Sequence, residues 1–246
     1  MKPDNQPDQR EEIVIADDPN DPVMEADRQV FRRLRNLGYV PKSIFDVGAS
    51  NSGWSCYIKR VVPEADFYLF EPLIDHSPAY QDFIQQILPI YPSFHLFKYA
   101  LGEKNGTVTM TIFEDTVSST ALNIAESGNK TTAVEAPMLT LDSAIEQFNL
   151  PQPQVIKIDT QGSELAILKG AAKTLPKVDV LFLECWLYRG YGSETPLLME
   201  IAHWLLQYDF RLWDIGDPYR NDQGILATLD CVFVNTNSSI SLPWHH

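Results

Sequence analysis

The feature that most constrains the fold is a regular alternation of apolar runs with helical patterns, which begins near residue 43. Short apolar or alternating runs predict strands, and the amphipathic segments between them predict helices. Strands separated by helices favour a mostly parallel sheet with right-handed crossovers and helices on both faces. The predicted strands are 43–48, 66–71, 94–100, 154–159, 178–185, 209–215 and 229–235, and the predicted helices include 53–62, 76–88, 141–149, 163–175 and 195–208.

The end of the chain departs from this alternation. The predicted strand 178–185 is apolar almost throughout, which is typical of a central parallel strand. No helical pattern separates the last two strands, and the segment 216–224 between them is rich in loop-forming residues. We therefore expect seven strands that end in an antiparallel hairpin.

The remaining segments complete one domain. Residues 1–20 are acidic and polar and predict a flexible tail, and residues 21–246 predict a single domain that opens with a helix in 21–42. The segment 102–140 interrupts the alternation and is expected to form a cap over a site. Asp21 is expected to cap the first helix, and four arginines of that helix are expected on a solvated face. They are Arg28, Arg32, Arg33 and Arg35.

Composition excludes several classes of function. The formal charge of −14 argues against a nucleic-acid partner. The three cysteines form no CxxC pair, no histidines have metal-ligand spacing, and no metal site is predicted. The polar N-terminus and the absence of an apolar run of about 18 residues predict neither a signal peptide nor a membrane span. We expect a cytoplasmic protein; the oligomeric state stays open.

The segment from Ile44 to Gly53 is an apolar run that breaks into small residues before a predicted helix. Glycine at such a strand–turn–helix junction lets a ligand approach the backbone closely. Here Asp46 precedes the glycines, and there is no Gly-x-Gly-x-x-Gly pattern. A carboxylate at this position suits a cationic ligand such as S-adenosylmethionine (SAM) better than a pyrophosphate.

Two further strand ends carry candidate ligand-binding residues. Glu71 follows Asp46 by 25 residues, close to the spacing at which an acidic residue meets the ribose hydroxyls of a bound nucleotide. Ala100 and Leu101, at the end of the next predicted strand, offer a small apolar wall for an adenine ring.

The segment 155–171 combines an apolar strand with Lys157 and Asp159 on one face. Asp159 falls at the carboxyl end of its strand, where ligands bind in parallel sheets. Glu184 ends the next strand, so the two carboxylates could share base work, grip a substrate hydroxyl or hold a divalent cation. Glu164 is expected to cap the following helix, and the aromatic residues Trp186, Tyr188 and Tyr191 stack on a ring substrate or pack against a helix.

Together these motifs resemble the FkbM family of methyltransferases over roughly residues 43–235. The motifs are Phe45-Asp46-Val47-Gly48-Ala49-Ser50, Phe70-Glu71-Pro72, Ala100-Leu101-Gly102, Thr140-Leu141-Asp142, Lys157-Ile158-Asp159-Thr160-Gln161-Gly162-Ser163-Glu164 and Leu168-Lys169-Gly170-Ala171. The resemblance implies a class I methyltransferase (Rossmann-like) fold. It also implies SAM-dependent O-methylation of a sugar, glycan or secondary metabolite.

The resemblance implies a role for each matched position. Cofactor-binding residues would be Asp46, Gly48 and Ser50 at the methionine end of SAM, Glu71 at the ribose, and Ala100 and Leu101 at the adenine. Asp159 and Glu184 would be catalytic, either positioning or deprotonating the acceptor. The sequence departs from the family at Ser52, where a glycine usually follows Asn51, so the loop could be one residue longer.

Three alternatives to this reading stay open. A dinucleotide-dependent oxidoreductase would need a Gly-x-Gly loop and a catalytic Tyr/Lys or His pair, which the sequence does not show. The other two keep the fold: a non-catalytic SAM-binding or scaffold protein, and a metal-assisted O-methyltransferase.

Overall fold

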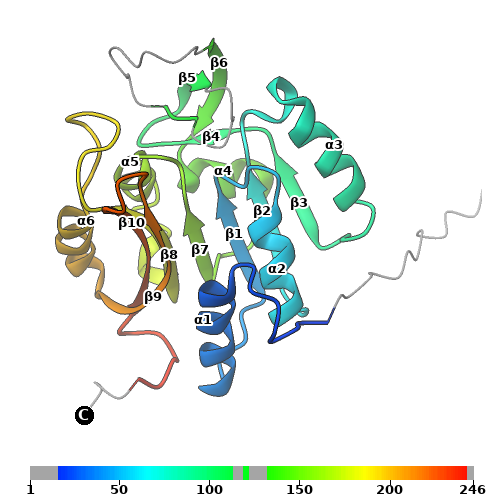
Figure 1. Ribbon diagram of the computed structural model, residues 1–246, viewed down its shortest axis with the longest axis vertical. Helices are drawn as coiled ribbons and strands as arrows, with labels where there is room; N and C mark the ends of the chain where they lie inside the picture. Colours follow the sequence, from blue (N-terminus) through cyan, green and yellow to red (C-terminus); the bar gives the residue numbers. More distant parts are fainter. Residues whose placement is uncertain (1–15, 113–118, 122–131, 243–246) are drawn as a thin grey trace, which may run out of the picture.

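A computed structural model describes residues 16–112, 119–121 and 132–242. Its main sheet has the strand order β3-β2-β1-β7-β8-β10-β9 (Figure 1). β10 is antiparallel to both β8 and β9, and the other neighbouring pairs of this sheet are parallel. The strands are β1 (Ser43–Val47), β2 (Asp66–Phe70), β3 (Phe94–Phe97), β7 (Val155–Ile158), β8 (Val180–Trp186), β9 (Phe210–Arg220) and β10 (Leu226–Asn235). The predicted seven-stranded, mostly parallel sheet with a C-terminal antiparallel hairpin is confirmed.

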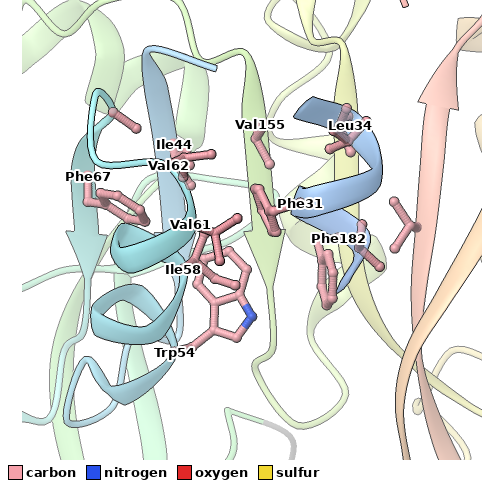
Figure 2. Close-up of a cluster of buried hydrophobic side chains, with 14 of the residues drawn as sticks. Phe31, Leu34, Ile44, Trp54, Ile58, Val61, Val62, Phe67, Val155 and Phe182 are labelled. Atoms are coloured by element: carbon pink, nitrogen blue, oxygen red, sulfur yellow. The ribbon is translucent and has the colours of Figure 1, made fainter. Parts of the chain in front are cut away.

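Helices cover both faces of this sheet. One core joins α1 (Glu25–Asn36), α2 (Gly53–Val61) and α3 (Pro78–Ile87) to the sheet, and Figure 2 shows its centre. The other core lies under α4 (Leu141–Phe148), α5 (Glu164–Lys169) and α6 (Leu198–Leu205). Side chains alternate between the cores along each strand: Ile44 belongs to the first core and Phe45 to the second. No helix among the described residues has the length and apolarity needed to cross a membrane.

A second, three-stranded sheet lies beyond the carboxyl ends of the central strands (Figure 1). It consists of β4 (Ala100–Leu101), β5 (Gly106–Ile112) and β6 (Thr132–Leu139). The predicted strand 94–100 is therefore split, because Ala100 and Leu101 pair with β6 instead of continuing β3. Met110 of β5 and Ala136 of β6 share a small apolar cluster with Tyr80 and Ile84 of α3.

The first helix begins later than expected. Met24 precedes α1 in the left-handed conformation, and the Asp21 carboxylate accepts a hydrogen bond from the Val23 amide in a turn outside the helix. The predicted tail is described only from residue 16. The segment 13–15, considered as a possible edge strand, and His245 and His246 lie outside the described residues.

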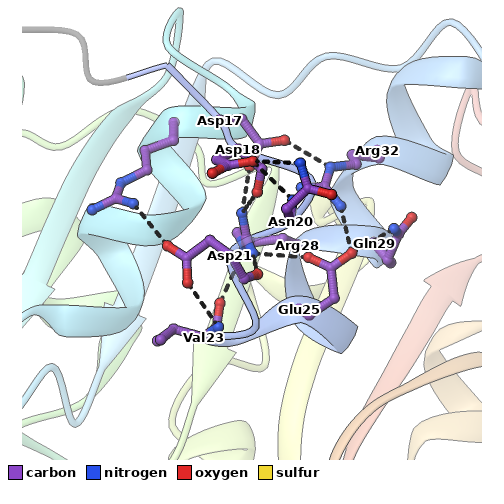
Figure 3. Close-up of polar contacts among 10 residues, drawn as sticks. Asp17, Asp18, Asn20, Asp21, Val23, Glu25, Arg28, Gln29 and Arg32 are labelled. Atoms are coloured by element: carbon purple, nitrogen blue, oxygen red, sulfur yellow. Dashed lines mark hydrogen bonds and ion pairs between the residues drawn. The ribbon is translucent and has the colours of Figure 1, made fainter.

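The expectation that all four arginines are solvated is wrong for Arg28. Its side chain is fully buried, and its guanidinium pairs with Asp17 at 2.7 Å and with Glu25 at 2.8 Å. It also donates to the backbone carbonyls of Asp18 at 2.8 Å and Val23 at 3.1 Å, so residues 17–25 wrap around it (Figure 3). The helix pattern alone did not reveal this, because the partners lie outside the helix or in its first turn.

Arg28 and Arg33 form a matched pair of substitutions that tests this wrapping. We expect Arg28→Ala to lower the free energy of unfolding by about 2–3 kcal/mol, because it leaves several backbone carbonyls without a donor and removes a buried cation from Asp17 and Glu25, which keep their ion pairs with Arg32. Arg33 pairs with Asp214 at 2.6 Å but is 43% exposed, so Arg33→Ala should cost at most about 1 kcal/mol. Urea denaturation measures both values, and equal effects would contradict the account.

Candidate active site

A cavity opens at the carboxyl ends of β1, β2 and β7, under the three-stranded sheet. It holds about 690 Å³ of empty space, which includes open solvent at its mouth. Its wall includes five predicted cofactor-binding residues and one predicted catalytic residue: Gly48, Ser50, Glu71, Ala100, Leu101 and Asp159. Met110, Ser119 and Ala121, from the segment 102–140, also line it.

The glycine turn at Gly48 brings two strand ends into direct contact. Gly48 has a φ of 77°, and a Cβ atom there would lie 1.9 Å from the Asp159 carbonyl oxygen. No residue with a side chain fits at this position. The turn between β1 and α2 is therefore seated on the end of β7, and one wall of the cavity is backbone.

The turn's amide groups are largely engaged within the protein. The N–H groups of Gly48 and Ala49 donate to the Phe70 carbonyl, and that of Ser50 donates to the Glu71 carboxylate at 2.9 Å. The N–H of Ser52 donates to the Ala49 carbonyl. An anion-binding loop needs free amides pointing at its ligand, so this turn is not built to hold a pyrophosphate.

Asp46, predicted at the methionine end of SAM, lies beneath the cavity and is not among the residues that line it. Its side chain is fully buried, accepts a hydrogen bond from the Ser55 hydroxyl at 2.6 Å, and pairs with Lys157 at 3.2 Å. The reason is alternation along β1. Asp46 and Ile44 face the same core, under α1 and α2, while Val47 and Gly48 reach the cavity.

Lys157 connects Asp46 to the cavity. Its ammonium lies 3.2 Å from the Asp46 carboxylate, 3.4 Å from that of Asp159 and 3.4 Å from the Gly48 carbonyl oxygen. Burial alone lowers the pKa of Lys157, but Asp46, Asp159 and Asp230 together raise it above its ordinary value. The lysine therefore stays charged.

Glu71 directly follows β2, and backbone amides hold both of its carboxylate oxygens in place. One accepts from the Leu73 amide at 2.8 Å and the other from the Ser50 amide at 2.9 Å. Burial raises the pKa of Glu71, and these amides act against the rise. Each carboxylate oxygen can accept a second hydrogen bond, so Glu71 can still receive two hydroxyl groups from a ligand in the cavity.

Asp159 is held from two sides. Besides its contact with Lys157, it accepts a hydrogen bond at 3.1 Å from the side-chain amide of Gln161, which in turn accepts from the Tyr191 hydroxyl at 2.9 Å. Thr120 donates to the Gln161 carbonyl at 2.7 Å. Gln161 thus joins Asp159 to the loop after β8 and to the segment around Ser119.

Glu164 holds the turn between β7 and α5. Its Oε1 accepts from the amides of Thr160 at 3.1 Å and Gly162 at 3.0 Å, while its Oε2 is buried without a hydrogen-bond partner. Burial raises the pKa of Glu164 to about 7. Thr160 and Gly162 precede α5, so Glu164 holds the turn before the helix instead of capping the helix as expected.

Glu184 lies beside the cavity and does not line it. Its Oε2 is buried with no hydrogen-bond partner, and burial raises the pKa of Glu184 well above its ordinary value, as do the charges of Asp159, Glu164 and Asp230. Among the residues that the structure describes, no three His, Cys, Asp or Glu side chains converge as metal ligands do.

Three residues that line the cavity were not predicted as site residues from the sequence: Gln161, Tyr80 and Ser119. Gln161 has a φ of 54°, which is uncommon for a residue other than glycine and marks the turn as specialised. Tyr80 reaches the Ser50 hydroxyl from α3 at 2.9 Å, and the buried Ser119 hydroxyl has no hydrogen-bond partner. The position of Gln161, two residues after Asp159 and directly before Gly162, could have identified it from the sequence. The other two contacts depend on tertiary packing.

Comparisons with known proteins agree with this geometry. The family model described as "Methyltransferase FkbM domain" matches residues 46–212. A curated relative, the hexuronic acid methyltransferase AglP of Haloferax volcanii, is 24% identical over 166 residues, which cover 65% of this chain and 63% of the relative's length.

Solved structures share the fold. Methyltransferase FkbM from Methylobacillus flagellatus KT has a TM-score of 0.51 at 19% identity, covering 79% of this chain and 43% of that chain. The O-methyltransferase from Bacillus cereus in complex with SAH (S-adenosylhomocysteine) has a TM-score of 0.50 at 12% identity, covering 90% of this chain and 84% of that chain.

The backbone conformation shows how Ser52 fits into the loop between β1 and α2. Ser52 itself has a left-handed φ of 64°, and α2 begins at the next residue. Ser52 thus takes, directly before α2, the conformation that glycine favours. The Ser52 hydroxyl is buried without a hydrogen-bond partner.

We predict that Ser52→Gly stabilises the protein by about 1 kcal/mol, because it removes a strained side chain and a buried unpaired hydroxyl. Gly48→Ala is the opposite control and should destabilise it, since the new methyl group meets the Asp159 carbonyl. Chemical denaturation compares the two. A destabilised Ser52→Gly protein would mean that the hydroxyl has a role.

Proposed function

Because the chain belongs to the FkbM methyltransferase domain family, we propose that it transfers a methyl group from SAM to a hydroxyl of a sugar, glycan or secondary metabolite. One observation carries the choice of cofactor. The cavity combines the Glu71 carboxylate with a turn whose amides are largely engaged, so it suits a cationic nucleoside better than a pyrophosphate.

The residues of the cavity fit SAM from end to end. Glu71 would take the ribose hydroxyls, and Ala100 and Leu101 would face the adenine. Gly48 and Ser50 would line the methionine end, while Asp46 acts from beneath through Lys157 and the Gly48 carbonyl. Bound SAM would supply an electrophilic methyl group on a sulfonium.

Asp159 and Glu184 would serve the acceptor. The protein must hold the acceptor hydroxyl in line with the methyl group and accept its proton. Asp159 lines the cavity and is oriented by Lys157 and Gln161, so we assign it the contact with the hydroxyl and the proton transfer. Glu184, on the neighbouring strand, would bind the acceptor beside it.

A sugar acceptor is supported by the relative named a hexuronic acid methyltransferase. The chain spans 63% of that protein's length at 24% identity, so the acceptor itself is not carried over. The aromatic group of Trp186, Tyr188 and Tyr191 lies beside the site and could contact a sugar ring. We further propose that the enzyme acts in the cytoplasm, since its three cysteines are free and buried.

The first test concerns the cofactor. Glu71→Gln should weaken SAH binding by about tenfold, because it removes the charge that accepts from the ribose. Asp66→Asn, at the opposite end of the same strand and exposed, is the matched control and should leave the affinity unchanged. Titration calorimetry measures both. Equal affinities in the two variants would refute the ribose assignment.

The second test separates binding from chemistry. Asp159→Asn should reduce turnover by about 100-fold or more, measured with the glycoside that gives the highest wild-type rate, while SAH binding is retained. The exposed Asp222→Asn is the control. Full turnover in Asp159→Asn would remove Asp159 from the proton transfer. A wild-type protein that binds SAH but methylates no acceptor would favour a non-catalytic SAM-binding protein.

A further inference from the structure

Three carboxylates lie at one level of the sheet, within or just after the neighbouring strands β7, β8 and β10. Glu184 of β8 and Asp230 of β10 are direct cross-strand partners. Asp159 follows the last pair of β7 and β8, Ile158 with Leu183, which places it level with Glu184. All three belong to the face covered by α1, because Phe182, two residues before Glu184, packs against Phe31.

Two of these carboxylates have no partner. In the described part of the chain, neither Glu184 nor Asp230 forms a side-chain hydrogen bond or an ion pair, and the Glu184 Oε2 is buried. The nearby cation, Lys157, lies against Asp46 and Asp159. Like charges directly opposite on neighbouring strands are destabilising, so this pair costs stability in its charged form unless a bound proton or a cationic ligand compensates it.

The charges around the pair come from every adjacent element. Burial raises the pKa of Asp230, as do Asp27 of α1, Asp159 after β7 and Asp217 of β9, while Lys157 lowers it. Asp27 accepts hydrogen bonds from the Trp54 indole at 3.1 Å and from the Asp217 amide at 3.0 Å, so it closes this side of the group. The surroundings of Asp230 are therefore dominated by negative charge.

The indole N–H of Trp186, on the same strand as Glu184, also lacks a hydrogen-bond partner among the described residues. Trp186 lies two residues beyond Glu184, on the same face of β8, and its side chain is 7% exposed. Its indole N–H is buried with no acceptor. A buried donor without an acceptor is uncommon in folded proteins, and an oxygen of a bound molecule would satisfy it.

We propose that Glu184 and Asp230 bind a protonated amino group of the acceptor while Trp186 donates to a neighbouring oxygen, so that the acceptor is an amino sugar. This inference rests on the proposed function. An ammonium carries three donors and a positive charge, which matches carboxylates that lack both donors and a cation. A uronate brings a negative charge to carboxylates and is disfavoured, and a neutral sugar leaves their charges unbalanced.

The test uses the full chain loaded with SAH and three probes: methyl glucosaminide, its N-acetyl derivative and methyl glucuronide. At neutral pH we expect the amine to bind at least about tenfold more tightly than the N-acetyl sugar, because it forms charge-assisted hydrogen bonds. The glucuronide should bind most weakly. Equal binding of the amine and N-acetyl probes, preference for the glucuronide, or no binding of the amine at tens of millimolar would overturn the inference.

Asp230→Asn supplies a second readout. It should abolish the preference for the amine and leave SAH affinity unchanged, while stability at pH 8 stays equal or rises because a like-charge contact is lost. Asp222→Asn, exposed in the turn between β9 and β10, is the matched control and should keep the preference. If Asp230→Asn weakens SAH binding as much as amine binding, the carboxylates serve the cofactor and the inference is wrong.

The two proposals fail separately. Absence of SAH binding to the wild-type protein defeats the proposed function. SAH binding without the amine preference defeats only the inference about the acceptor.

Discussion

The buried ion pairs of Lys157 connect the sheet to the site. The strand order reverses between β1 and β7, the position at which ligands bind in open α/β sheets. Lys157 joins these two strands because its ammonium contacts Asp46 of β1, Asp159 after β7 and the carbonyl of Gly48. Burying a charge is costly unless it is paired and hydrogen-bonded. The Gly48 turn and the Asp159 carboxylate are therefore held in one arrangement.

This arrangement divides the carboxylates into two groups by their partners. Both carboxylate oxygens of Asp46 and of Glu71 contact protein groups, Asp46 beneath the cavity and Glu71 at its side, and Glu71 can still accept hydrogen bonds from a ligand. Glu184 and Asp230 have no partners in the described chain and lie beside the cavity, next to Asp159. In the proposed function, the engaged carboxylates would organise the cofactor site, and the unpartnered ones would be available to the acceptor.

Much of the fold and part of the site could be predicted from the sequence. Apolar runs located the strands, and strand ends located Glu71 and Asp159, because ligands bind at that edge of a parallel sheet. The alternation of side chains could also have placed Asp46 under α2, although the motif suggested a ligand contact. Arg28, Tyr80 and the split of β4 from β3 could not be predicted, since they depend on contacts between distant segments.

The central claim is that the cavity at the switch between β1 and β7 is a cofactor site with one orientation. A crystal structure of the protein with SAH tests it most directly. We predict the ribose on Glu71, the adenine against Ala100 and Leu101, and the sulfur directed toward Asp159. SAH bound elsewhere, or with its adenine at the Gly48 turn, would contradict the account.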